Sequence, residues 1–263
     1  MRKTLVALAC AASCGTPYAF AADRLGTNVP FNWSGAYVGV SGGITITQAD
    51  VGLGAVNGDL LTLDVSNGLF LDTVDGTDVD IMGGVRGGFD VQKGALTFGV
   101  RAGFEKLGNG SASSHSALDP NCSTPLFCGL DTQSRYTTDV KAMASAEALV
   151  GVAFGRNRAF VTAGVATAKI DNTFDLALVP TQPGNLAYAN SFSEEDWRNG
   201  FTVGAGVERA LSDNFSVSLD YRYYDFEDVS VRAIDPPNFG DNFMDYEFSN
   251  RGHIASIGLN ARF

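Results

Sequence analysis

Apolar and polar side chains alternate along several segments of the chain, and the pattern is clearest over residues 200–228. Because successive side chains of a β-strand point to opposite faces, this alternation predicts two strands, each with one apolar and one polar face. The short polar sequence of Ser212, Asp213 and Asn214 between them is typical of a hairpin turn. The apolar face carries Phe201, Val203, Val207, Val217, Leu219 and Tyr221, and the polar face includes Glu208, Asp220 and Arg222.

Six further segments show the same alternation, at residues 36–47, 79–91, 95–106, 137–154, 158–170 and 251–263. The connections between the eight segments alternate between three-residue turns and long stretches, the latter at 48–78, 107–136, 171–196 and 229–250. Long loops on one side and short turns on the other are typical of outer-membrane barrels. The pattern therefore predicts an all-β fold, an eight-stranded antiparallel transmembrane β-barrel. A soluble periplasmic β-sandwich is the alternative fold, but it gives no reason for this sorting of connections.

The charged residues indicate which face of the strands looks inward. Burying many charges in a dry core costs several kcal/mol for each one that lacks a partner. An apolar face turned to lipid instead places the charges in a hydrated barrel interior, which eight strands leave just wide enough for side chains to fill. We therefore predict a closed lumen with a charge network of Arg86, Arg101, Glu105, Lys141, Glu147, Glu208, Asp220, Arg222 and Arg262.

The N-terminus has the features of a secretory signal peptide. Arg2 and Lys3 precede an apolar stretch, and alanines at positions 19 and 21 form a small-x-small cleavage site. The expected organisation is a signal peptide at 1–21, a lead-in at 22–35 and an outer-membrane β-barrel at 36–263. After the signal, the sequence has no apolar run of about 20 residues, the length with which a helix crosses a bilayer.

Charge and cysteine usage exclude some partners and suggest a crosslink. The net charge is −11 over 263 residues and becomes −13 once Arg2 and Lys3 leave with the signal. Such an acidic chain is a poor partner for nucleic acid, whose binding depends on lysine and arginine. Cys122 and Cys128 lie close together in a polar stretch of an exported chain, which predicts a local disulfide. The sequence predicts no metal site and no cofactor.

Three stretches resemble a known family: WSGAYVG at 33–39, the hairpin at 202–228 and HIASIGLNARF at 253–263. They are similar to the small outer-membrane immunogenic proteins of Alphaproteobacteria, porin-family relatives of the OmpA-type barrel. The resemblance implies a location in the Gram-negative outer membrane, with lipid and lipopolysaccharide around the barrel and the loops outside the cell. It also implies that Phe263 is the signal read by the barrel-assembly machinery. The loop at 107–136 does not match the family, so a relative's host or surface ligand is not carried over.

The function expected from these features is a structural and surface-interaction role, with a closed charged lumen and long acidic extracellular loops. One alternative is a narrow passive porin for small solutes. Another is a lipid A-modifying barrel enzyme that uses His253 near Ser249 and Glu247, since such enzymes place a histidine, a serine and a carboxylate at the loop-side rim. No nucleophile motif accompanies His253, so no catalytic residue is assigned and the protein is not expected to be an enzyme.

Overall fold

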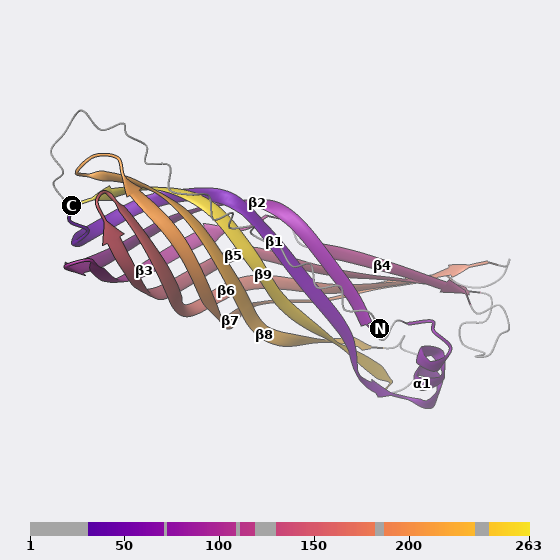
Figure 1. The fold of residues 1–263 in the computed structure, drawn as a ribbon. Coiled ribbons are helices and arrows are strands. Elements are labelled where there is room, and N and C mark those ends of the chain that lie inside the picture. Colours follow the sequence, from indigo (N-terminus) through magenta and orange to yellow (C-terminus); the bar gives the residue numbers. More distant parts are fainter. Residues whose placement is uncertain (1–30, 71–72, 109–110, 119–129, 182–186, 235–241) are drawn as a thin grey trace, which may run out of the picture.

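The computed structural model describes residues 31–70, 73–108, 111–118, 130–181, 187–234 and 242–263. Within these ranges the chain forms nine antiparallel strands and one short helix (Figure 1). Among them, no helix has the length and apolar character needed to cross a membrane. The elements are β1 (Gly35–Asn57), α1 (Asp59–Ser66), β2 (Thr73–Lys93), β3 (Leu96–Lys106), β4 (Ser111–Leu118), β5 (Leu130–Phe154), β6 (Asn157–Pro180), β7 (Tyr188–Ala210), β8 (Phe215–Ile234) and β9 (Phe243–Arg262).

The strands close into a barrel. They are hydrogen-bonded in the order β3-β2-β1-β9-β8-β7-β6-β5-β4, and a further pairing of β3 with β5 joins the ends. Both β3 and β4 pair with β5, at 142–152 and 131–138 respectively, so they are successive parts of one barrel strand. The nine segments thus form the eight-stranded antiparallel barrel that the sequence predicts, and this prediction is confirmed.

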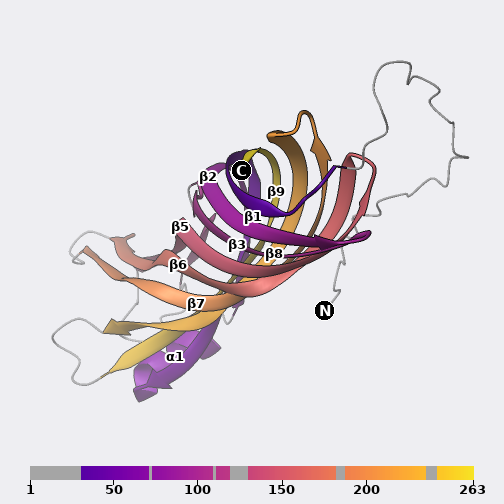
Figure 2. The ribbon, with the colours of Figure 1, turned by 90° about the vertical axis from the view of Figure 1, so that its left-hand side faces the viewer.

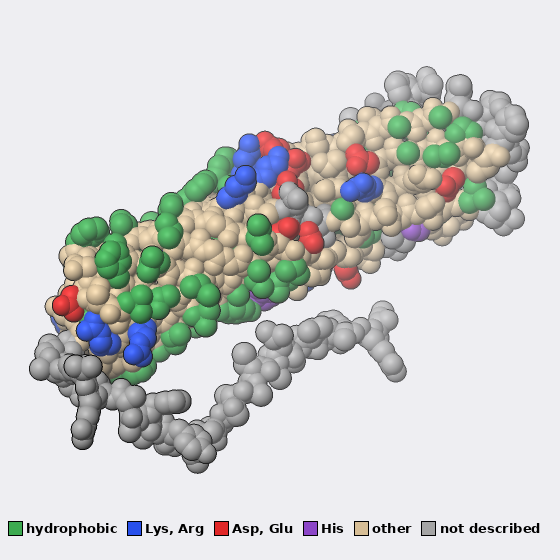
Figure 3. Space-filling view, turned by 90° about the horizontal axis from the view of Figure 1, so that it is seen from above, with side chains coloured by type: hydrophobic (Ala, Val, Ile, Leu, Met, Phe, Trp, Pro, Cys, Tyr) green, Lys and Arg blue, Asp and Glu red, His purple; other side chains and the backbone are tan. Residues whose placement is uncertain are grey.

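The half of the barrel nearest the short turns has an apolar outer wall (Figure 3). Val85 on β2, Val165 on β6 and Leu219 on β8 are each more than half exposed although their side chains are aliphatic. Such a wall is stable against hydrocarbon, because a closed barrel leaves no unpaired backbone edge. Its other outward residues include Val38, Val40, Ile81, Phe89, Phe98, Val100, Val150, Val161, Val203, Val207, Ile257 and Leu259.

The strands continue far beyond this wall. A tilted strand crosses a bilayer with about 9–11 residues, whereas β5 has 25 and β6 has 24. On β6 the pattern changes along its length: Val161 and Val165 face outward near the turns, but farther along Phe174 and Leu176 are buried inside and Asp175 lies outside. Alternation persists while the apolar residues move to the inner face, as in a water-soluble β-protein. We call residues 48–57, 73–78, 111–118, 130–140, 170–180, 188–196, 227–234 and 243–250 the extension.

In the extension the barrel divides into two facing sheets (Figure 2). β7 pairs with β8 only over 200–210, and β2 pairs with β3 only over 83–93, so two seams open beyond these residues. The result is a sheet of β4, β5, β6 and β7 opposite a sheet of β2, β1, β9 and β8. Between them lies an apolar core of Val51, Leu69, Phe70, Leu130, Tyr136, Phe174, Leu176, Leu178, Val229, Val231, Ala233, Met244, Tyr246 and Phe248.

The expected long loops are therefore much shorter than the sequence pattern suggested. The stretch 48–78 contains the end of β1, α1 and the start of β2, and 107–136 contains β4 and the start of β5. The stretches 171–196 and 229–250 likewise contain strand residues at both ends. The prediction missed these strands because their apolar residues lie on the face opposite to that of the membrane half. The outermost parts of three of the four connections, at 119–129, 182–186 and 235–241, lie outside the described residues.

The opposite end of the barrel has the short turns that the sequence predicts. Gly94 and Gly155 adopt φ values of 63° and 62°, a left-handed conformation that glycine takes without a Cβ clash, and each lies in a two-residue connection. The C-terminus lies at this end (Figure 1). The chain before β1 also lies here, because the Phe31 backbone N–H donates to the Gly155 carbonyl at 3.2 Å. This end is therefore sealed partly by the lead-in.

Candidate functional site

Ten charged side chains fill the membrane half of the barrel, and we call them the lumen network. Its centre is Arg101 on β3, which is 7% exposed. The Arg101 guanidinium donates to Glu147 on β5 at 2.6 and 2.8 Å and to Asp220 on β8 at 2.9 Å. Arg86 also donates to Asp220, at 2.8 Å. The network comprises Arg86, Asp90, Arg101, Glu105, Glu147, Arg158, Glu208, Asp220, Arg222 and Arg262.

Arg222 extends the network toward the extension. Its guanidinium is paired with Glu105 on β3 and lies 3.5 Å from the Glu147 carboxylate. Glu147 also accepts a hydrogen bond from Thr202 at 3.3 Å. The network joins both neighbouring and distant strands. Arg101 and Glu147 are register partners on paired strands, whereas Arg86 on β2 reaches Asp220 on β8 across the lumen.

A second group lies near the short turns, around Asp90 on β2. Asp90 accepts from Arg158 on β6 at 2.7 Å and from Arg262 on β9 at 2.8 Å, and Glu208 accepts from Arg158 at 2.6 Å. Trp33 of the lead-in is fully buried beneath them, with the two guanidiniums 4.7 and 4.9 Å from its ring centroid. This cation–π stacking explains why the lead-in is fixed at the barrel end.

Sequence reasoning missed two members of the network. Asp90 lies four residues after Arg86 on β2, so the alternation of the strand places both on the inner face, and this was sufficient to predict Asp90. Arg158 is the second residue of β6, directly after a turn, and the sequence does not indicate whether a side chain at the end of a strand points inward or outward. With both included, five arginines face five carboxylates among the described lumen residues, so the formal charges balance.

Lys141 does not belong to the lumen, which corrects the sequence prediction. A bulge between Val140 and Ala142 shifts the register of β5, so the alternation does not run unbroken through Lys141. Its side chain lies on the outer wall, 3.1 Å from the Asp171 carboxylate and paired with Glu195. A one-residue bulge is not visible in a pattern of alternating residues, and this is why the prediction was wrong.

An apolar layer closes the lumen above the charges. Met143, Tyr224 and Ile254 come from three different strands and none is exposed to solvent. The Tyr224 hydroxyl finds partners in the threonine hydroxyls of β1, 3.1 Å from Thr47 Oγ1. The layer comprises Met82, Leu107, Val140, Met143, Ala166, Ala168, Ile170, Tyr224, Phe226 and Ile254. The interior is thus filled twice, first by paired charges and then by hydrocarbon.

The two histidines lie away from these interior groups. His253 is on the outer wall, where its Nδ1 is 2.8 Å from the Tyr221 hydroxyl and its ring stacks on that of Tyr221. Its neighbours in register are Ile46 and Tyr223. His115 lies on β4, with Nε2 3.4 Å from the Gly68 carbonyl oxygen. Among the described residues, neither histidine is hydrogen-bonded to a serine, threonine or cysteine that it could activate as a nucleophile.

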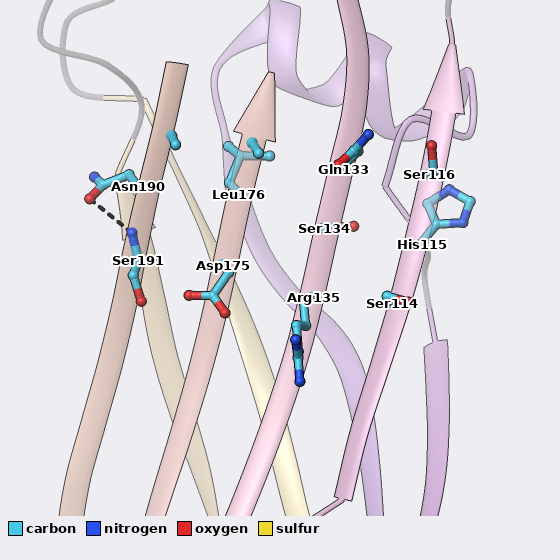
Figure 4. Close-up of a pocket in the computed structure, with 12 residues that line it drawn as sticks. Ser114, His115, Ser116, Gln133, Ser134, Arg135, Asp175, Leu176, Asn190 and Ser191 are labelled. Carbon is cyan, nitrogen blue, oxygen red and sulfur yellow. Dashed lines mark hydrogen bonds between the residues drawn. The ribbon is translucent and has the colours of Figure 1, made fainter. Parts of the chain in front are cut away.

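The outer face of the sheet formed by β4 to β7 is hollowed in the extension (Figure 4). The concavity has a volume of about 750 Å³, and Arg135 and Asp175 are register neighbours at its centre. Ser114 and Ser191 continue this row on β4 and β7. The lining is Ser114, His115, Ser116, Gln133, Ser134, Arg135, Asp175, Leu176, Ala177, Ala189, Asn190 and Ser191. Arg135 and Asp175 thus place two charged groups among short hydroxyl, amide and aliphatic side chains.

Some predicted features lie at the chain end or outside the described residues. Phe263 is 79% exposed, and its backbone N–H donates to the Ala36 carbonyl at 2.9 Å. Its role as the assembly signal stays a prediction. The signal peptide at 1–21 and the Cys122–Cys128 disulfide lie outside the described residues and also stay predictions.

Together the apolar outer wall, the charged interior and the strictly antiparallel closure define an outer-membrane β-barrel protein. A family model described as an outer membrane protein beta-barrel domain matches residues 6–263, and the chain belongs to this family. It is therefore an integral protein of the Gram-negative outer membrane.

Relatives agree with this assignment. The 31 kDa outer-membrane immunogenic protein of Brucella melitensis biotype 1 is 24% identical over 238 residues, which are 89% of this chain and 85% of the relative. The protein of the same name from Brucella suis biovar 1 matches equally. The resemblance to outer-membrane immunogenic proteins is thus confirmed. Among solved structures, the outer-membrane protein OprG of Pseudomonas aeruginosa is 11% identical, with 90% of this chain and 100% of that chain covered and a TM-score of 0.45.

Proposed function

We propose that the protein is a closed barrel with a structural role in the outer membrane, and that its extension is a contact surface on the cell exterior. The observation that carries this proposal is the double filling of the lumen. The lumen network fills the membrane half, and the apolar layer around Met143 and Ile254 follows it. Ions crossing this path would have to displace paired charges and then pass dry hydrocarbon, which is unfavourable at both steps.

Single-channel conductance of the refolded protein in planar bilayers tests the closed lumen. Protein that migrates as the folded form on unheated gels is expected to give no steady conductance, while an open porin in the same bilayer gives regular steps. Steady conductance from the folded protein would overturn the closed lumen and support the narrow passive porin.

The same proposal assigns no enzymatic activity. His253 contacts Tyr221 and lies among outward aromatic side chains, which suits an interfacial position better than a reaction centre. Lipid A extracted from cells that produce the parent or the His253→Ala variant is therefore expected to have the same mass spectrum. A species that appears only with the parent protein would show that the histidine takes part in lipid modification.

The contact role rests on the shape of the extension. Two sheets packed on a core of 14 buried apolar residues form a rigid body outside the membrane, unlike a set of flexible loops. The polar concavity around Arg135 and Asp175 lies on the outer face of this body, where a polar surface ligand has access.

A further inference from the structure

Three lysines lie next to one another on the outer wall, at the border between its apolar and polar parts. We call Lys106 on β3, Lys141 on β5 and Lys169 on β6 the lysine row. Ala142 is the register partner of both Lys106 and Lys169, and Lys141 occupies the bulge directly before it. The three ammonium groups therefore come from three adjacent strands of one face. Figure 3 shows acidic and basic side chains gathered where the densely apolar part of the wall ends.

The contacts of the row leave donors free for a ligand. Lys169 Nζ is 2.6 Å from Glu195, and Lys141 is paired with Glu195 and Asp171. An ammonium group has three donors, so both lysines keep at least one. Lys106 is exposed and has no ion pair among the described residues. The Lys141 side chain is 37% and the Lys169 side chain 39% exposed, so solvent or a head group reaches them.

The carboxylates of this face lie to one side of the row. Asp139, Asp171 and Glu195 are register neighbours on β5, β6 and β7, on the side of the lysines that is farther from the apolar wall. Glu195 is paired with both Lys141 and Lys169 and so holds these two lysines in place. An anion embedded in the membrane surface therefore meets the cations before it meets the carboxylates.

The wall below the row suits acyl chains. On β5 the outward positions that follow the bulge toward the short turns are Ala144, Ala146 and Ala148, whereas β3 presents Phe104 and β6 presents Val165 on either side. These apolar side chains give acyl chains a lipid-facing surface directly below the row. Beside the row, Trp197 is the register partner of Lys169 and is 48% exposed, as is typical of an aromatic residue at a membrane interface.

We propose that the lysine row binds the phosphates of the glycolipid in the outer leaflet, with its acyl chains on the wall below. The ligand is a phosphorylated glucosamine lipid of the lipid A type, because the row lies on the extension side of the membrane and that leaflet carries this lipid. Basic residues near a membrane surface attract anionic head groups. The opposite wall differs: Tyr223 and His253 are register neighbours there, and the nearby Arg251 is paired with Asp50. The site therefore belongs to one face only and does not depend on whether the lumen is closed.

Titration of the folded full-length mature protein in uncharged maltoside micelles tests this site, with Trp fluorescence and native mass spectrometry as readouts. The probes are diphosphoryl lipid A, monophosphoryl lipid A and phosphatidylglycerol. The test variant is Lys106→Gln with Lys169→Gln, and the control is Lys93→Gln, an exposed lysine at the short-turn end of β2. Folded protein is selected by its heat-modifiable gel migration. If the double variant does not fold, Lys106→Gln alone takes its place, since this lysine holds no ion pair among the described residues.

For diphosphoryl lipid A, the double variant is expected to bind at least tenfold more weakly than the parent, and Lys93→Gln within twofold of it. Monophosphoryl lipid A should bind the parent more weakly than diphosphoryl lipid A. The single Lys106→Gln variant should bind diphosphoryl lipid A about fivefold more weakly than the parent, as expected when one lysine near a membrane surface is removed. Equal binding by the parent and the lysine-row variant would overturn the site. Equal binding of phosphatidylglycerol and diphosphoryl lipid A by the parent would overturn the assignment of the ligand and indicate general attraction of anionic lipids.

Discussion

Replacing Arg101 with methionine removes the centre of the lumen network while keeping an unbranched side chain in its place. Glu147 then loses its two shortest hydrogen bonds, at 2.6 and 2.8 Å, and keeps only Arg222 at 3.5 Å and Thr202 at 3.3 Å. Asp220 loses one bond and keeps Arg86 at 2.8 Å. The effect should therefore fall mainly on Glu147, whose carboxylate stays buried without a close cation.

Breaking a buried ion pair by removing one partner costs about 3–5 kcal/mol. Because Asp220 retains Arg86, we expect the lower end, about 3 kcal/mol for Arg101→Met. With a urea dependence of about 1–3 kcal/mol per molar, this corresponds to a midpoint lowered by roughly 1–3 M. The measurement is urea unfolding of the refolded protein in micelles, followed by heat-modifiable migration and by fluorescence of Trp33 and Trp197.

Two comparisons make the result specific to the network. Arg209→Met changes an exposed arginine at the short-turn end of β7, whose side chain donates to Asn157 at 3.3 Å and forms no ion pair with the described residues. This change should alter stability by less than about 0.5 kcal/mol. In a double-mutant cycle, Arg101→Met and Glu147→Met should couple by about 1 kcal/mol or more. If Arg101→Met and Arg209→Met unfold at the same urea midpoint, the ion pairs of Arg101 do not stabilise the barrel and the reasoning is wrong.

Three further predictions concern the wall, the extension and the outer charges. Leu219→Arg puts a charge on the lipid-facing wall and should lower the stability of the folded barrel by about 2–4 kcal/mol if residue 219 lies at mid-bilayer. The membrane fraction should then contain less folded protein. If Leu219→Arg assembles as well as Leu219→Ala, this wall does not face lipid. Phe174→Ala empties part of the extension core, where Phe174 is fully buried, and should destabilise it by about 3–5 kcal/mol. Protease added to intact cells should then cut the variant while the barrel keeps its heat-modifiable migration, and resistance equal to the parent would contradict a separate core. Hydrogen bonds from Lys141 and Lys169 lower the pKa of Glu195 to about 2. The stability that these ion pairs contribute is therefore fully present above the ordinary pKa of glutamate and is lost as the pH falls through about 2. A carboxyl NMR titration should give this midpoint for Glu195 in the parent and a higher one in Lys169→Gln.

The amino-acid sequence by itself determined the membrane half of this protein. Residues such as Val165, Leu219 and Glu208 alternate with period two, and this period fixes both the strands and the direction of their faces once the turns are sorted by length. The same alternation indicates which charged side chains point inward, except for Arg158 at the end of a strand. Such inferences succeed because a strand's side-chain direction is a local property.

Tertiary structure decided what local periodicity does not contain. The bulge at Lys141 moves that side chain from the lumen to the outer wall, and only the pairing of β5 with β6 reveals it. The extension shows the same limit: Phe174 and Leu176 follow the same period of two as Val161, Ala163 and Val165, yet they face inward because water rather than lipid surrounds them. Alternation indicates that a strand has one apolar and one polar face. The surrounding solvent and the partner sheet decide which face is buried.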